Sequence, residues 1–122
     1  MSITTLAPAK PVTEAAKPNA TTKSFKDFGL NAILLESLAK MNFTTPTAIQ
    51  AATIALSMQG KDVLASAETG SGKTAAFVLP MVNALLNSPR GSAMVLLPTR
   101  ELAVQVIDVV HKLLGFKSGI RT

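Results

Sequence analysis

The sequence contains no cysteine, no tryptophan and no tyrosine. The lack of cysteine excludes disulfide bonds, thiolate catalysis and cysteine-ligated zinc. Aromatic residues make up only 4% of the chain, so a platform that stacks several nucleic-acid bases is not available. No apolar run is long enough to span a membrane, and residues 1–24 lack the uninterrupted apolar segment of a secretory signal. We therefore expect a cytoplasmic protein without membrane contact.

The length and charge of the chain limit what it can form. Its 122 residues suffice for at most one small domain, and 48% of them are apolar, which is enough for a core. The formal net charge is +5, of which residues 1–24 contribute +2 and residues 61–122 contribute +3. No dense basic patch results, so ordinary solubility and a polyanionic partner both remain open. The sequence indicates no oligomeric state.

Residues 1–24 differ in composition from the rest. They are rich in alanine, threonine, proline and lysine and show neither a strand nor a helix period. Such a segment cannot bury enough apolar surface to offset the entropy of ordering it. We expect a disordered tail here, either a plain solvated leader or a tether for RNA. Ordered structure is expected over residues 25–122, in two parts that span residues 25–60 and 61–122.

The most informative stretch runs from Ala65 to Thr74 and reads ASAETGSGKT. Residues 62–65 before it favour a short buried strand, and residues 75–79 after it begin a helix that we expect to reach Asn87. Glycines in such a turn let backbone N–H groups surround phosphate oxygens at the helix N-terminus. Lys73 is then expected to reach the β- and γ-phosphates of a nucleotide, and the Thr74 hydroxyl to hold Mg²⁺. The alternative is a loop of small residues that caps a helix, with Lys73 merely solvated.

A second motif lies upstream, where Thr47 and Gln50 have the spacing of a capping box. It predicts a helix from Ala48 to about Met58, after an amphipathic helix over residues 31–41. Gln50 has two interpretations at this point. It is either the capping glutamine alone, or its amide also pairs with N7 and the exocyclic amine of an adenine.

A third motif follows residues 93–97, whose continuous apolar run favours a strand buried on both faces. Pro98, Thr99 and Arg100 lead from it into a helix that we expect to end at Gly115. Strands alternating with helices predict an α/β fold with a parallel sheet, whose loops at the strand ends carry ligands. Thr99 and Arg100 suit either a helix cap and a solvated side chain or a contact to a phosphodiester backbone.

Together, Phe25 with the 43–50 segment, the 67–74 loop and the 98–103 segment closely resemble the N-terminal half of a DEAD-box ATP-dependent RNA helicase. The resemblance implies a P-loop, RecA-like fold with three layers, a parallel sheet covered by helices. It also implies that this fold is incomplete, because the family's Asp-Glu-Ala-Asp segment, its Ser-Ala-Thr motif and its second RecA-like domain are not among these 122 residues. Nucleotide and RNA binding with little turnover is therefore expected.

The resemblance also implies roles for individual residues. Gln50 would read the adenine edge of ATP, with Phe25 stacked on the ring. Lys73 and Thr74 would act in catalysis, with Thr74 on Mg²⁺. An RNA backbone would be contacted without sequence preference by Pro98, Thr99 and Arg100. The adenine pocket would be shaped by Thr45, Pro46 and Thr47, and the triphosphate would be held by Ala67, Glu68, Thr69, Gly70, Ser71, Gly72, Lys73 and Thr74.

Two other functions are compatible with these motifs. One is a non-enzymatic remnant that binds a nucleotide or a partner without turnover. The other is a different P-loop NTPase or a small kinase. The 98–103 segment disfavours it, because a kinase has no reason to carry that segment.

Overall fold

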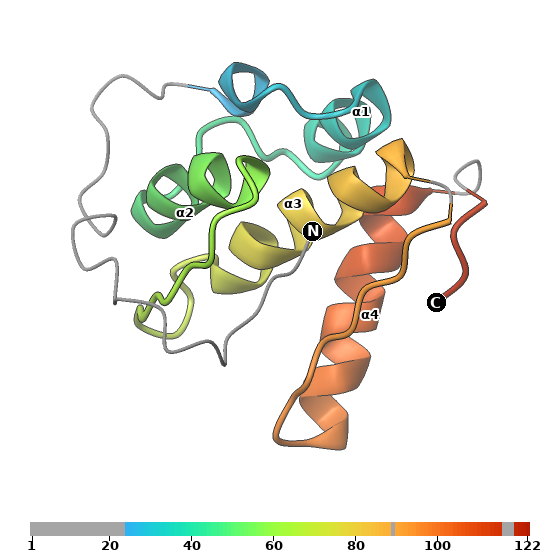
Figure 1. The fold of residues 1–122 in the computed structure, drawn as a ribbon. Helices are drawn as coiled ribbons and strands as arrows, with labels where there is room; N and C mark the ends of the chain where they lie inside the picture. Colours follow the sequence, from blue (N-terminus) through green and yellow to red (C-terminus); the bar gives the residue numbers. More distant parts are fainter. Residues whose placement is uncertain (1–23, 89, 116–118) are drawn as a thin grey trace.

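The structure is a computed structural model that describes residues 24–88, 90–115 and 119–122 (Figure 1). The expected tail, apart from Ser24, lies outside the described residues. The described part contains a short 3₁₀ helix and four α-helices, and none of them is long and apolar enough to cross a membrane. The elements are η2 (Phe25–Phe28), α1 (Ala32–Lys40), α2 (Ala48–Met58), α3 (Lys73–Asn87) and α4 (Arg100–Leu114).

Three of the four α-helices begin at a side chain that caps them. The Asn31 side chain accepts a hydrogen bond from the backbone N–H of Ile33 at the start of α1. Thr47 and Gln50 form the predicted capping box at the start of α2, and Thr99 Oγ1 accepts from the Leu102 N–H at the start of α4. These local bonds satisfy N–H groups that a helix leaves without partners. The predicted helices over residues 31–41 and 48–58 are confirmed to within one residue. The predicted helix ends at Asn87 and Gly115 are confirmed by the ends of α3 and α4.

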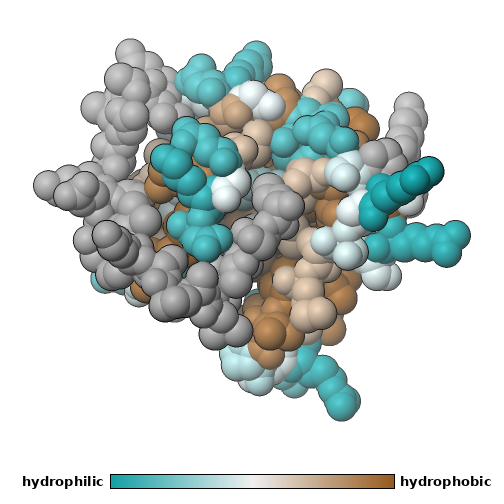
Figure 2. Space-filling model, viewed as in Figure 1, coloured by the Kyte–Doolittle hydropathy of each residue, from teal (hydrophilic) through white to brown (hydrophobic). Residues whose placement is uncertain are grey.

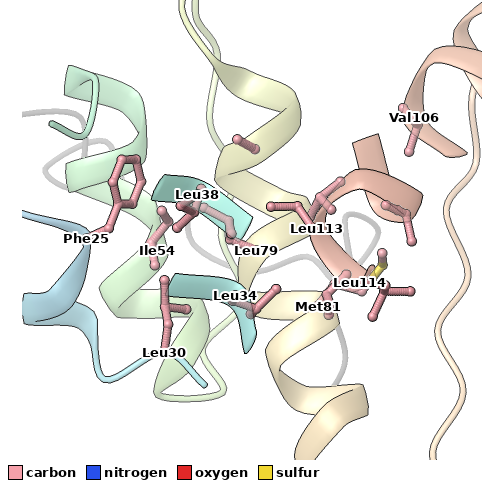
Figure 3. Close-up of a cluster of buried hydrophobic side chains, with 14 residues drawn as sticks. Phe25, Leu30, Leu34, Leu38, Ile54, Leu79, Met81, Val106, Leu113 and Leu114 are labelled. Atoms are coloured by element: carbon pink, nitrogen blue, oxygen red, sulfur yellow. The ribbon is translucent and has the colours of Figure 1, made fainter. Parts of the chain in front are cut away.

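The core is formed between helices, with α3 in the middle (Figures 1 and 3). Helix α3 contacts α2 on one side and α4 on the other, and α1 lies against α4. Two polar contacts between helices, one buried and one partly buried, support this arrangement. Ser37 Oγ donates to the Leu113 carbonyl over 2.8 Å, and Asn83 Oδ1 accepts from the Asn31 N–H over 2.7 Å. The largest fully buried side chains are Leu34, Leu38, Ile54, Leu79, Leu113, Val78, Val82 and Pro80.

The two predicted strands do not form in the described part of the chain. Residues 62–65 and 93–97 have no regular secondary structure, so the parallel sheet expected from the sequence is not present. The apolar side chains that such a sheet would bury are exposed, at 60% for Leu64, 80% for Met94 and 78% for Leu96. A strand is stable only when a neighbouring strand satisfies its backbone groups, and these two segments have no such neighbour among the residues that the structure describes. The predicted helices are therefore confirmed, whereas the sheet that they would cover is not.

An apolar groove of about 730 Å³ runs between the two extended segments. Side chains of α3 and α4 form its floor, among them Phe77, Met81 and Val106. Figure 2 shows hydrophobic residues gathered over α4 and the extended segment beside it. The predicted burial of residues 93–97 on both faces was wrong, because Met94 and Leu96 are exposed.

Candidate nucleotide-binding site

The segment from Glu68 to Gly72 forms a tight turn that leads into α3. The Glu68 carbonyl accepts hydrogen bonds from both the backbone N–H and the hydroxyl of Ser71, over 3.2 and 2.6 Å. Gly70 and Gly72 have φ angles of +83° and +86°, a conformation that residues with a Cβ rarely adopt. The turn therefore depends on glycine at these two positions.

The N-terminus of α3 differs from those of the other α-helices in the described residues. Its N-cap is Gly72, and no side chain caps it. Hydrogen bonding within the helix begins with the Ala76 N–H, which donates to the Gly72 carbonyl over 3.2 Å. The N–H groups of the first turn are therefore left for an external acceptor, and the helix dipole favours an anion there. This arrangement fits a phosphate group.

Two side chains of the same turn can act on a bound phosphate. Lys73 is the first residue of α3 and is exposed, so its ammonium group can reach a ligand beyond the helix end. Thr74 is half-buried and borders the apolar groove. The described residues contain no group of three or more His, Cys, Asp or Glu side chains that could hold a metal ion.

Gln50 connects the start of α2 to this loop. Its side chain is only 3% exposed. The amide oxygen accepts from the Thr47 N–H over 2.9 Å, and the amide nitrogen donates to the Gly72 carbonyl over 3.1 Å. The first bond confirms the capping interpretation. The second joins two motifs that lie 22 residues apart in the sequence, and no local pattern could have predicted it.

A small hollow lies between the start of α2 and the 67–74 loop. Its volume is about 370 Å³. Of the residues predicted to bind the nucleotide, it brings together Thr47, Ala67 and Ser71. Ala48, Ile49 and Ser66 complete the lining, and no sequence motif had indicated them as site residues.

Phe25 lies apart from this hollow, in an aromatic cluster. It is 3% exposed, and its ring centroid is 6.2 Å from that of Phe28 and 6.3 Å from that of Phe43. The rings of Phe25 and Phe43 are inclined by only 21°, so they are stacked on each other. Thr45 is exposed and Pro46 half-buried in the turn that follows Phe43. Stacking of Phe25 on a base stays a prediction.

The predicted RNA contact lies at the start of α4. Pro98, Thr99 and Arg100 are all exposed. Thr99 is the N-cap of α4, which agrees with one of its two interpretations. Its hydroxyl oxygen accepts a hydrogen bond from the Leu102 N–H over 3.2 Å. Arg100 forms no ion pair with any residue that the structure describes. Its guanidinium is therefore available to a ligand, and the RNA contact stays a prediction.

Comparison with known proteins agrees with these motifs. Residues 47–122 match the family model of DEAD/DEAH box helicases. The ATP-dependent RNA helicase DRS1 of Lodderomyces elongisporus is 48% identical over 101 residues, which cover 80% of this chain and 15% of that protein. The probable ATP-dependent RNA helicase DDX47 of Homo sapiens is 46% identical over 114 residues, which cover 90% of this chain and 25% of that protein. The chain belongs to the DEAD/DEAH box helicase family.

A solved structure of another DEAD-box protein has a similar fold. A crystal structure of a DEAD box protein from Methanococcus jannaschii superposes with a TM-score of 0.72 at 36% identity. The superposition covers 78% of this chain and 26% of the other. The helices of this chain are therefore arranged as in a DEAD-box RecA-like domain, of which the chain spans a part.

Proposed function

We propose that this chain binds ATP with Mg²⁺ at the 67–74 loop and an RNA backbone at the start of α4. The observation that carries the first part is the N-terminus of α3, which has a positive-φ glycine as its cap and no capping side chain. Lys73 would contact the β- and γ-phosphates, and Thr74 would hold the metal. Bound Mg²⁺ would neutralise charge on the phosphate oxygens. In a whole helicase, this binding would be coupled to ATP hydrolysis and RNA unwinding.

Adenine recognition is assigned to Gln50. Its amide oxygen has a second lone pair and its nitrogen a second hydrogen, beyond those used by Thr47 and Gly72. An amide that offers both a donor and an acceptor matches the amine and N7 of adenine, whereas guanine presents an acceptor where adenine has its amine. Gln50 can therefore hold the loop and read the base together.

We expect Gln50→Ala to weaken ATP binding about tenfold more than GTP binding, since one good bidentate pair discriminates by about 1–3 kcal/mol. Calorimetric titration of the chain with each nucleotide in the presence of Mg²⁺ measures both affinities. Gln59→Ala is the matched control, because Gln59 is exposed at the other end of α2. Equal losses for ATP and GTP would show that Gln50 does not read the base.

RNA contact is assigned to Arg100 on the basis of its exposure and its lack of an ion pair in the described residues.

We expect Arg100→Ala to weaken binding of a single-stranded RNA uniformly across sequences. It should also reduce the slope of log affinity against log salt by about 0.7, the value for one phosphate contact on a single strand. Fluorescence anisotropy at several salt concentrations measures both effects. Arg121→Ala is the control, because Arg121 is also exposed but lies beyond the C-terminal end of α4. It should change the slope less than Arg100→Ala does. A larger effect of Arg121→Ala would move the RNA contact away from α4.

A further inference from the structure

Two glycines of the phosphate loop share a backbone conformation but differ in their surroundings. Gly70 has a φ of +83° and Gly72 a φ of +86°, so a side chain at either position would be strained by a similar amount. A Cβ added at Gly70 would meet no atom within 4 Å. A Cβ added at Gly72 would lie 2.5 Å from Gln50 Nε2 and 3.1 Å from Thr47 Oγ1. Of these two glycines, only Gly72 would bring a Cβ into contact with side chains of another segment.

The Gln50 side chain is not free to move away from that Cβ. It is buried, and its two polar atoms are held by the Thr47 N–H and the Gly72 carbonyl. A shift that relieved the contact would break at least one of these bonds and leave a buried polar group without its partner, which is costly. The amide of Gln50 thus occupies the space that a side chain at position 72 would need.

We propose that Gln50 is a positioning residue for the phosphate loop and forms a steric pair with Gly72. The amide fills the space beside Gly72 and fixes its carbonyl, which is the first acceptor of α3. It thereby orients the N–H groups at the helix start, whichever base a nucleotide carries. This effect on phosphate rests on the proposed function, whereas the steric pair does not, because it exists without ligand.

A comparison of alanine variants of the 122-residue chain tests the pair without ligand. Gly72→Ala should lower the Tm by about 5 °C more than Gly70→Ala, because strain of similar size is joined by a clash only at position 72. In a Gln50→Ala background, most of the extra loss caused by Gly72→Ala should disappear, and only the smaller part due to the 3.1 Å contact with Thr47 Oγ1 should remain. The loss caused by Gly70→Ala should be the same in both backgrounds.

Three results would overturn the proposal. One is an equal loss of Tm for Gly70→Ala and Gly72→Ala, and another is a Gly72→Ala loss that Gln50→Ala does not relieve. The third is a Gly72→Ala chain that fails to fold and is not restored by Gln50→Ala. Restored folding of that double variant would support the pair.

Binding of magnesium tripolyphosphate, which has no base, tests the effect on phosphate. Gln50→Ala should weaken it about fivefold, the loss expected for one hydrogen bond that orients the site. Unchanged affinity would show that Gln50 does not position the loop. Failure of the unmodified chain to bind tripolyphosphate would instead contradict the proposed function, and the Tm comparison would still decide the steric pair.

Discussion

Replacement of Leu79 by alanine is expected to lower the free energy of unfolding by about 3 kcal/mol, within the range for large-to-small changes in a core. Leu79 is fully buried in the middle of α3, at the centre of the cluster shown in Figure 3. Its truncation removes apolar contacts and leaves a cavity that helices on several sides cannot easily close. Urea denaturation followed by circular dichroism measures the loss.

Leu96→Ala is the matched control, because it makes the same chemical change at a side chain that is 78% exposed. Its effect should stay within about 0.5 kcal/mol, as for most surface substitutions. The two variants together locate the core on the helical side of the molecule. Equal losses of unfolding free energy in the two variants would contradict this location of the core, because they would mean that Leu96 is as buried as Leu79.

Replacement of Lys73 by alanine is expected to weaken binding of ATP with Mg²⁺ about 100-fold, as expected when a charge-assisted contact to phosphate is lost. Lys73 is exposed at the first position of α3, and no described residue forms an ion pair with it. Its ammonium is therefore free to contact phosphate oxygens beside the N–H groups of the helix start. Calorimetric titration with ATP and Mg²⁺ measures the affinity.

Lys61→Ala controls for the loss of one positive charge, because Lys61 is also exposed and lies between α2 and the loop. It should change ATP affinity by less than about threefold, since an exposed charge outside the site is screened by salt. The Tm of both variants should match that of the unmodified chain. A Lys61→Ala loss as large as that of Lys73→Ala would show that ATP binds through general charge attraction rather than through the loop.

Features set by nearby residues could be predicted from the sequence. The capping box at Thr47 and the N-cap at Thr99 involve partners three residues away, so the starts of α2 and α4 follow from the local pattern. The glycine-rich turn before Lys73 is equally local, because the conformations that Gly70 and Gly72 adopt favour glycine. These local rules were enough to place the candidate phosphate site.

Features set by distant residues could not be predicted in the same way. The apolar runs at residues 62–65 and 93–97 have strand character, but a strand also needs a partner that the pattern does not contain. The bond from Gln50 to the Gly72 carbonyl depends on how α2 packs against α3. The burial of Phe25 against Phe43 likewise results from packing between segments. In each case tertiary contacts decide the outcome.

Phosphate binding at the start of α3 can be observed by an NMR titration of the ¹⁵N-labelled chain with ATP and Mg²⁺. The largest amide shifts should fall on residues 70–75, where the loop and the uncapped helix start offer their N–H groups. The start of α1, which Asn31 caps, should change little. If no shifts occur, or if those at the start of α1 are as large as those at residues 70–75, phosphate does not bind specifically at the start of α3.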